Sequence, residues 1–112
     1  MNEPVSIIIL NYNGKRFLEE CLSSVFRQSY TEFELILFDN NSVDGSMEFL
    51  REHFSDNRLK MIRSEKNLGF AGGNNEALKY CSNDLIVLLN NDTKVEIDWL
   101  KSLVHAMTDN RT

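Results

Sequence analysis

Four short segments rich in asparagine and aspartate lie at or just after the ends of apolar runs. They are residues 11–13, 39–41, 67–74 and 90–92. Amide and carboxylate oxygens accept hydrogen bonds from ribose hydroxyls and base N–H groups, and a carboxylate can hold a hard divalent cation that bridges phosphate oxygens. Each segment alone is a common turn composition. Four of them together predict a polar binding site for a phosphate-bearing ligand.

Two aspartates carry the most specific chemistry in these segments. Asp92 follows the most hydrophobic run of the chain, residues 85–89, and a carboxylate at that position suits a divalent cation. Asp39 ends the run 35–38 and can accept a hydrogen bond from a ribose hydroxyl or a base N–H. Both residues can instead act as turn or helix caps, so the residues alone leave both interpretations open.

Three of the five glycines lie close together, at Gly69, Gly72 and Gly73. Glycine inside a helix is less favourable than alanine by about 1 kcal/mol, whereas it suits tight bends and close approaches of the backbone to a ligand. We therefore expect residues 64–73 to form a loop, either one that approaches a ligand or an ordinary flexible connection. The next helix would then begin at Asn74.

Motifs of several other nucleotide sites and of hydrolases are missing. The sequence has no G-x-G-x-x-G, no G-x-x-x-x-G-K-[ST] and no G-x-S-x-G. The usual dinucleotide site, the phosphate-binding loop of NTPases and the α/β-hydrolase nucleophile elbow are therefore excluded. The net charge is −5 and no more than two basic residues are adjacent. Binding to nucleic acid is consequently not expected.

The elements that must position these residues alternate between strand and helix. Apolar runs predict strands at 5–10, 35–38, 59–62 and 85–89, and apolar residues at helical spacing predict helices at 15–28, around 47–54, at 74–81 and at about 97–107. Strands buried on both faces and joined by helices indicate a parallel sheet, in which ligands bind at the carboxyl ends of the strands. We expect an α/β fold with a mostly parallel sheet and helices on both faces.

Size and composition indicate one domain over residues 1–112. The chain has a mass of 13.0 kDa and is 42% hydrophobic and 26% charged, as is typical of a globular protein. Cys21 and Cys81 fall among apolar helical positions, so we expect both to be reduced core residues. No apolar run reaches the roughly 18–20 residues of a membrane span, and no signal peptide is recognisable. The expected location is cytoplasmic; association with the inner face of the membrane would come from parts outside this sequence.

Four segments in order resemble the amino-terminal half of family 2 glycosyltransferases, and most closely a rhamnosyltransferase-like branch. They are residues 5–13, 38–45, 67–74 and 89–92. The resemblance implies a GT-A fold, a Rossmann-like sheet of the nucleotide-diphospho-sugar transferase type. It also implies a UDP- or dTDP-sugar donor, Mg²⁺ or Mn²⁺, a glycan or lipid-linked acceptor, and transfer to a hydroxyl with inversion at the anomeric carbon.

The resemblance also assigns roles to residues, with Asp39 bonding the base and Asp92 binding the metal. The nucleotide-binding residues that it implies are Asn11, Tyr12, Asn13, Asp39, Asn41, Asn67, Gly69, Gly73, Asn74, Asn90 and Asn91. Asn90 stands where the family commonly has the first aspartate of an Asp-X-Asp motif. An amide contributes no charge, so we expect a lower metal affinity.

The general base that the family uses is expected in a carboxyl-terminal half outside this sequence, so the chain resembles a truncated enzyme that carries only the donor and metal site. A non-catalytic nucleotide-binding or assembly module is the alternative. A sugar-nucleotide pyrophosphorylase is a more distant one, because residues 11–14 lack the glycine-rich basic loop of those enzymes. An exposed sheet edge or face in a half-fold would favour homo-oligomers.

Overall fold

Four parallel strands form one sheet with the order β3-β2-β1-β4. The structure is a computed structural model that describes residues 3–109. Its strands are β1 (Val5–Asn11), β2 (Phe33–Asp39), β3 (Leu59–Arg63) and β4 (Leu85–Asn90). All four predicted strands are confirmed, and β2 begins at Phe33, earlier than expected. The order follows from right-handed crossovers that first build outward from β1 through β2 to β3 and then return to its other side.

The strand register brings the polar segments to one edge of the sheet. Asn11 pairs with Asp39, and Asp39 pairs with Arg63 on the next strand. On the other side of β1, Leu10 pairs with Asn90. Because parallel strands share one direction, their carboxyl ends meet at the same edge. We call this edge, formed by the last residues of the strands and the segments that follow them, the carboxyl rim.

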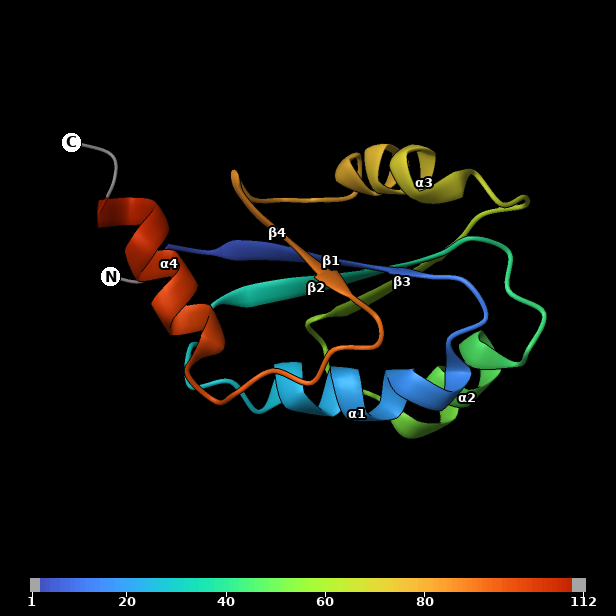
Figure 1. Cartoon of the computed structure of the whole chain (residues 1–112), viewed down its shortest axis with the longest axis horizontal. Helices are drawn as coiled ribbons and strands as arrows, with labels where there is room; N and C mark the ends of the chain where they lie inside the picture. Colours follow the sequence, from blue (N-terminus) through green and yellow to red (C-terminus); the bar gives the residue numbers. More distant parts are fainter. Residues whose placement is uncertain (1–2, 110–112) are drawn as a thin grey trace.

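Helices cover both faces of the sheet, as expected. They are α1 (Lys15–Phe26), α2 (Ser46–His53), α3 (Gly69–Leu78) and α4 (Trp99–Asp109). Figure 1 shows α1 and α2 on one face and α3 alone on the other, with α4 beside the amino end of β1. None of the helices within residues 3–109 is long and apolar enough to cross a membrane.

Alternate residues of β1 enter two separate cores. Ile7 and Ile9 pack into the larger core with α1, α2 and α4, while Ile8 packs into a smaller core beneath α3. All three are at most 1% exposed. A strand buried on both faces has no need of polar alternation, which explains the nearly continuous apolar run at residues 5–10. Cys21 lies in the larger core and Cys81 borders the smaller one, and both are free thiols, as predicted.

The expectation of a glycine-rich loop up to residue 73 is wrong, because α3 already begins at Gly69. Gly69 has a φ of +77°, a left-handed conformation that favours glycine. A Cβ on Gly73 would lie 2.6 Å from Leu10 Cδ1 and 2.9 Å from Asn40 Nδ2. The helix therefore lies directly on the ends of β1 and β2, and this tertiary packing outweighs the low helix propensity of glycine.

Replacing Gly73 with alanine should destabilise the fold although alanine is the better helix former. The added Cβ must displace Leu10 or Asn40, and overpacking of this kind costs about 1–3 kcal/mol. Gly72→Ala is the matched control, because its Cβ would meet only Leu68 Cβ, at 3.2 Å. Urea unfolding should show a clear loss of stability for Gly73→Ala and a smaller change for Gly72→Ala; equal effects would contradict the packing role of Gly73.

Candidate functional site

A buried hydrogen-bonded cluster joins the ends of β1 and β2. Asn11 Nδ2 donates to Asp39 Oδ1 at 2.8 Å, and Ser42 Oγ donates to the same oxygen at 2.7 Å. The Ser42 backbone N–H donates to Asp39 Oδ2 at 2.8 Å. Asn11 and Asp39 are fully buried and Ser42 is 4% exposed. These bonds stabilise the carboxylate away from water, so in this structure Asp39 holds the rim together from inside.

Asn13 and Asn41 shape the loops of the rim. Both have positive φ, +54° and +66°, a conformation that asparagine tolerates better than most residues. The Asn13 N–H donates to Ser42 Oγ at 2.8 Å, and the Val43 N–H donates to Asn13 Oδ1 at 2.9 Å. The structure therefore shows Asn13 in a turn-forming role, which is a common role for asparagine.

Asn91 connects the end of β4 to the end of β1. Its Nδ2 donates to Asn11 Oδ1 at 3.0 Å, and the Gly14 N–H donates to the same oxygen at 3.1 Å. A Cβ on Gly14 would lie 2.2 Å from Asn91 Nδ2. Gly14 is therefore required for this close approach, and the Asn11 side chain links three strands: its own, β2 and β4.

Asn40 fixes the start of α3 to the rim. Its Nδ2 donates to the Gly69 carbonyl at 3.1 Å, and the Leu68 N–H donates to its Oδ1 at 3.2 Å. Asn67 caps the same turn, since its Oδ1 accepts a hydrogen bond from the Gly69 N–H at 2.9 Å. The sequence interpretation placed Asn40 among the polar residues of a strand end but assigned it no role, because nothing local predicts a partner 29 residues away.

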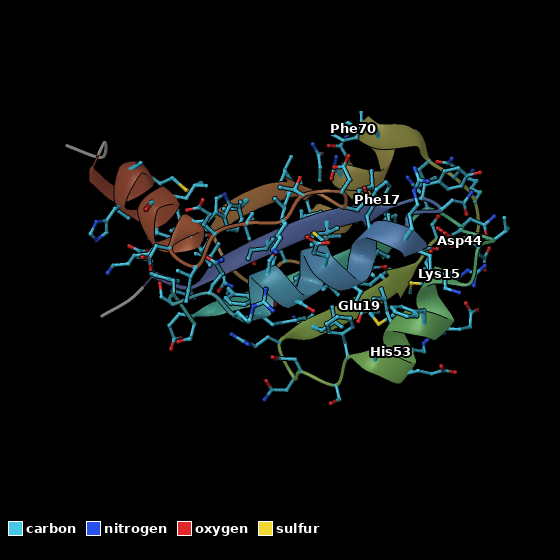
Figure 2. All side chains as sticks on the ribbon, turned by 60° about the horizontal axis from the view of Figure 1, so that its bottom comes forward. Lys15, Phe17, Glu19, Asp44, His53 and Phe70 are labelled. Atoms are coloured by element: carbon cyan, nitrogen blue, oxygen red, sulfur yellow. The ribbon has the colours of Figure 1, made fainter. Side chains whose placement is uncertain are left out.

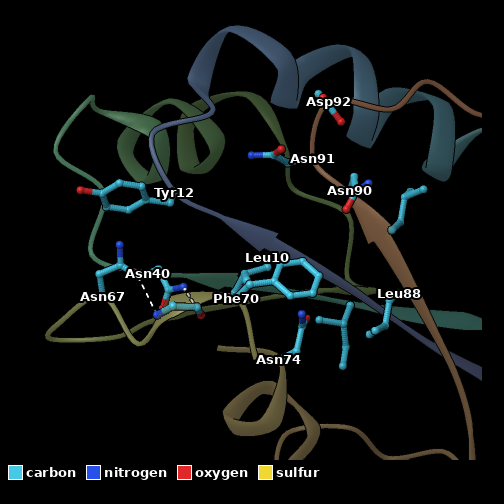
Figure 3. A pocket seen from close by; sticks show the side chains of 13 residues that line it. Leu10, Tyr12, Asn40, Asn67, Phe70, Asn74, Leu88, Asn90, Asn91 and Asp92 are labelled. Atoms are coloured by element: carbon cyan, nitrogen blue, oxygen red, sulfur yellow. Dashed lines mark hydrogen bonds between the residues drawn. The ribbon is translucent and has the colours of Figure 1, made fainter. Parts of the chain in front are cut away.

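A pocket of about 420 Å³ opens at the rim between α3 and the ends of β1 and β4 (Figure 3). Its polar lining consists of Tyr12, Asn40, Asn67, Asn74, Asn90, Asn91 and Asp92, and its remaining lining consists of Ile8, Leu10, Gly69, Phe70, Leu88 and Leu89. Of the residues predicted for the site, the pocket lining does not include Asn11, Asn13, Asp39, Asn41 and Gly73. Asn11, Asp39 and Gly73 are buried, and Asn13 and Asn41 form the loops of the rim.

Sequence reasoning missed the apolar part of the pocket. Leu10 and Leu88 look like ordinary strand residues, and Phe70 like a core residue of a loop or helix. Leu10 and Leu88 could have been placed on the same face only from the register of the sheet, in which Leu88 pairs with Ile8, two residues before Leu10. The pocket is thus half amide and carboxylate, half hydrocarbon, a composition typical of small-molecule sites.

Asp92 is the one carboxylate that lines the pocket among residues 3–109. It is exposed at the start of the segment after β4. The negative charge of Asp92 also affects a buried side chain. Burial raises the pKa of the Cys21 thiol to about 11, and the nearby Asp92 carboxylate adds to that rise. Within residues 3–109, no group of three or more His, Cys, Asp or Glu side chains is placed to hold a metal. Protein ligands alone therefore do not form a closed cation site in this region.

Asp44 lies outside the pocket, where it joins the starts of α1 and α2. Figure 2 shows it near Lys15. Its carboxylate accepts hydrogen bonds from the Lys15 and Ser46 backbone N–H groups, both at 3.0 Å. Burial works to raise the pKa of Asp44, but the hydrogen bonds from Ser46 and Lys15 outweigh it and leave the pKa below its usual value. Asp44 is thus an ionised structural residue of the rim.

The family model described as Glycosyl transferase family 2 matches residues 6–112. The chain belongs to glycosyltransferase family 2. The match covers all four polar segments and every strand apart from Val5, the first residue of β1. It confirms the family suggested by the order of the motifs in the sequence.

Two enzymes of Escherichia coli are similar to this chain in sequence. The chain is 40% identical over 88 residues to the UDP-Glc:alpha-D-GlcNAc-diphosphoundecaprenol beta-1,3-glucosyltransferase WfgD of Escherichia coli, covering 79% of this chain and 34% of that enzyme. It is 31% identical over 94 residues to chondroitin synthase of Escherichia coli, covering 84% of this chain and 14% of that enzyme. The chain therefore spans about a third of the first relative and a smaller part of the second.

Solved structures of longer enzymes share the fold. S. aureus TarS 1–349 in complex with UDP-GlcNAc matches with a TM-score of 0.85 and 25% identity, over 95% of this chain and 31% of that one. The mannosyltransferase PcManGT from Pyrobaculum calidifontis, in complex with GDP-Man and Mn²⁺, matches with a TM-score of 0.82 and 26% identity, over 95% of this chain and 32% of that one. The expected GT-A fold of family 2 is thereby confirmed.

Replacing Gly14 with alanine should destabilise the family 2 rim through Asn91. The new Cβ would lie 2.2 Å from Asn91 Nδ2 and 2.6 Å from Asn11 Oδ1, and displacing the amide leaves buried groups without partners, at a cost of about 1–3 kcal/mol. The measurement is the free energy of unfolding in urea.

A double-mutant cycle provides the control for this assignment. Asn91→Ala removes the amide that the new Cβ would strike, so Gly14→Ala should cost less in that background than in the wild type. If the losses in unfolding free energy of the two single variants simply add in the double variant, Gly14 and Asn91 are not energetically coupled.

Proposed function

We propose that the chain is the donor-binding part of a glycosyltransferase that moves a sugar from a nucleotide-diphospho-sugar to an acceptor hydroxyl with inversion. The observation that carries this proposal is the pocket at the carboxyl rim, which combines amide side chains with the exposed Asp92 carboxylate. Its location agrees with the rule that open parallel sheets bind ligands at the ends of their strands. Family membership supplies the reaction class.

The nucleotide would occupy the side of the pocket near Tyr12 and Asn67. Tyr12 is 51% exposed, which leaves its ring available to a uracil or thymine base. A similar enzyme, TarS, is described in complex with UDP-GlcNAc, which supports a uridine nucleotide. Asn11 and Asp39 would act from beneath, by holding the rim through their mutual bond. Direct contact of Asp39 with the base stays a prediction, as do the acceptor, the cytoplasmic location and the oligomeric state.

The residues present fit a divalent cation that is shared with the ligand. Asp92 offers hard oxygen ligands at the pocket edge, and Mg²⁺ is commonly bound through one or two carboxylates together with substrate phosphates. Asn90 and Asn91 add amide oxygens nearby but no charge. A bound Mg²⁺ or Mn²⁺ would neutralise the diphosphate in a chain whose net charge is −5. The described complex of PcManGT with GDP-Man and Mn²⁺ supports this assignment.

The described chain supplies no general base at the pocket. Asp92, its single lining carboxylate within residues 3–109, is the proposed metal ligand. Deprotonation of an acceptor hydroxyl would therefore depend on a group other than the residues that line this pocket. This same observation favours a second candidate function, a nucleotide-binding module that is active only with another chain.

Metal-dependent nucleotide binding should depend on Asp92. In calorimetric titrations with UDP and dTDP, with and without Mn²⁺, we expect tighter binding with the metal and a loss of at least about tenfold in Asp92→Ala. Asp92→Asn tests the charge alone, and Asp84→Ala is the control because Asp84 is an exposed residue just before the amino end of β4. Unchanged metal-dependent affinity in Asp92→Ala would rule out the metal assignment.

The chain alone should bind donor without transferring it. We expect no sugar transfer from UDP-glucose to added glycan acceptors in the presence of Mn²⁺, because no base lines the pocket. Product analysis by mass spectrometry measures this directly. Transfer by the isolated chain would show that a residue of this sequence acts as the base and would contradict its expected position outside it.

A further inference from the structure

Helix α3 leaves the neighbouring edge strand partly uncovered. It packs on β1 and β2, while Leu88 of β4, on the same face of the sheet, is 55% exposed. Phe70, in the first turn of α3, is 68% exposed. Exposed apolar side chains are common singly on protein surfaces. These two differ because both line one concave pocket.

Figure 3 shows the Phe70 ring between the side chains of Leu10 and Leu88, with Tyr12 on the opposite side of the pocket. Leu10 and Leu88 face the same side because residues of even number on β1 and β4 point toward α3, as Ile8 in the smaller core demonstrates. A hydrocarbon surface of this kind gives no stabilisation to a diphosphate. A ligand group that packs there must itself present an apolar face.

Amide groups border this apolar surface. Asn74, one turn after Phe70 on α3, and Asn90, beyond Leu88 on β4, both line the pocket. Neither side-chain amide makes a hydrogen bond to another residue within the described range 3–109, so both remain available to a ligand. The combination of an aromatic face with free amides beside it matches a pyranose ring, which has C–H bonds on its faces and hydroxyls around its edge.

We propose that Phe70 is a specificity-determining residue that packs against the sugar ring of the donor, with Asn74 donating to or accepting from a sugar hydroxyl. The proposal rests on the proposed function and deepens it, because it assigns the sugar, rather than the base, to this side of the pocket. Tyr12 then serves the base and Phe70 the sugar. The two aromatic side chains are contributed by the end of β1 and the start of α3.

The test compares sugar nucleotides with bare nucleotides by calorimetry in the presence of Mn²⁺. The probes are UDP-glucose and UDP-GlcNAc against UDP, and dTDP-rhamnose against dTDP. For the sugar nucleotide that the wild type binds best, Phe70→Ala should weaken binding about fivefold, equivalent to about 1 kcal/mol. Binding of the bare nucleotide should change less than twofold. Phe70→Tyr keeps the ring and should keep the affinity.

Phe17→Ala is the matched control. Phe17 is also a partly exposed aromatic residue, 39% exposed, but it lies on α1 and does not line the pocket (Figure 2). It should leave both affinities unchanged. Far-UV circular dichroism and urea unfolding of each variant confirm that the chain is folded when its binding is measured.

Each other result overturns the proposal in a recognisable way. Equal weakening for the bare nucleotide and the sugar nucleotide would assign Phe70 to the nucleotide. No weakening for either, or a wild type that binds no sugar nucleotide more tightly than its nucleotide, would leave Phe70 as a surface residue. Failure of the proposed function can be told apart from failure of the Phe70 proposal, because in that case the wild type would bind neither UDP nor dTDP in the presence of Mn²⁺.

Discussion

The buried hydrogen bond between Asn11 and Asp39 is the interaction on which the carboxyl rim depends. A buried carboxylate is costly unless it is well hydrogen-bonded, and this one receives the Asn11 amide together with the backbone and side chain of Ser42. The oxygen of the same Asn11 side chain accepts from Gly14 and Asn91. One side chain thus connects the ends of β1, β2 and β4, and the pocket is built on a surface whose polar groups are already satisfied.

A second constraint, the close approach of α3 to the sheet, gives the pocket its wall. Gly73 allows the helix backbone to lie on Leu10 and Asn40, and Asn40 then holds the first turn through the Gly69 carbonyl and the Leu68 N–H. Because that turn is fixed at the rim, Phe70 is held over the pocket on a rigid element. Side chains on helices keep their positions better than side chains on loops.

The fold could be predicted from the sequence because a β-branched run such as residues 5–10 has few alternatives to a doubly buried strand. The site could be predicted only in part. A strand-end residue can be placed at the rim, but successive side chains point to opposite faces, so Asn11 is buried while its neighbour Leu10 lines the pocket. The predicted start of α3 was wrong because Gly73 is needed for close packing against Leu10, and Leu10 lies 63 residues earlier in the sequence.

The charge of the pocket explains why its polar groups are mostly amides. A chain with a net charge of −5 repels a diphosphate, and every further carboxylate at the rim would increase that repulsion. The rim instead places one exposed carboxylate, Asp92, where a cation can be shared with the ligand, and the two residues before it, Asn90 and Asn91, are amides that also line the pocket. Asp39, the other acid of the polar segments, is kept buried and fully hydrogen-bonded. Recognition of the uncharged parts of a ligand then falls to amides and to the apolar surface of Leu10, Phe70 and Leu88, neither of which changes charge with pH.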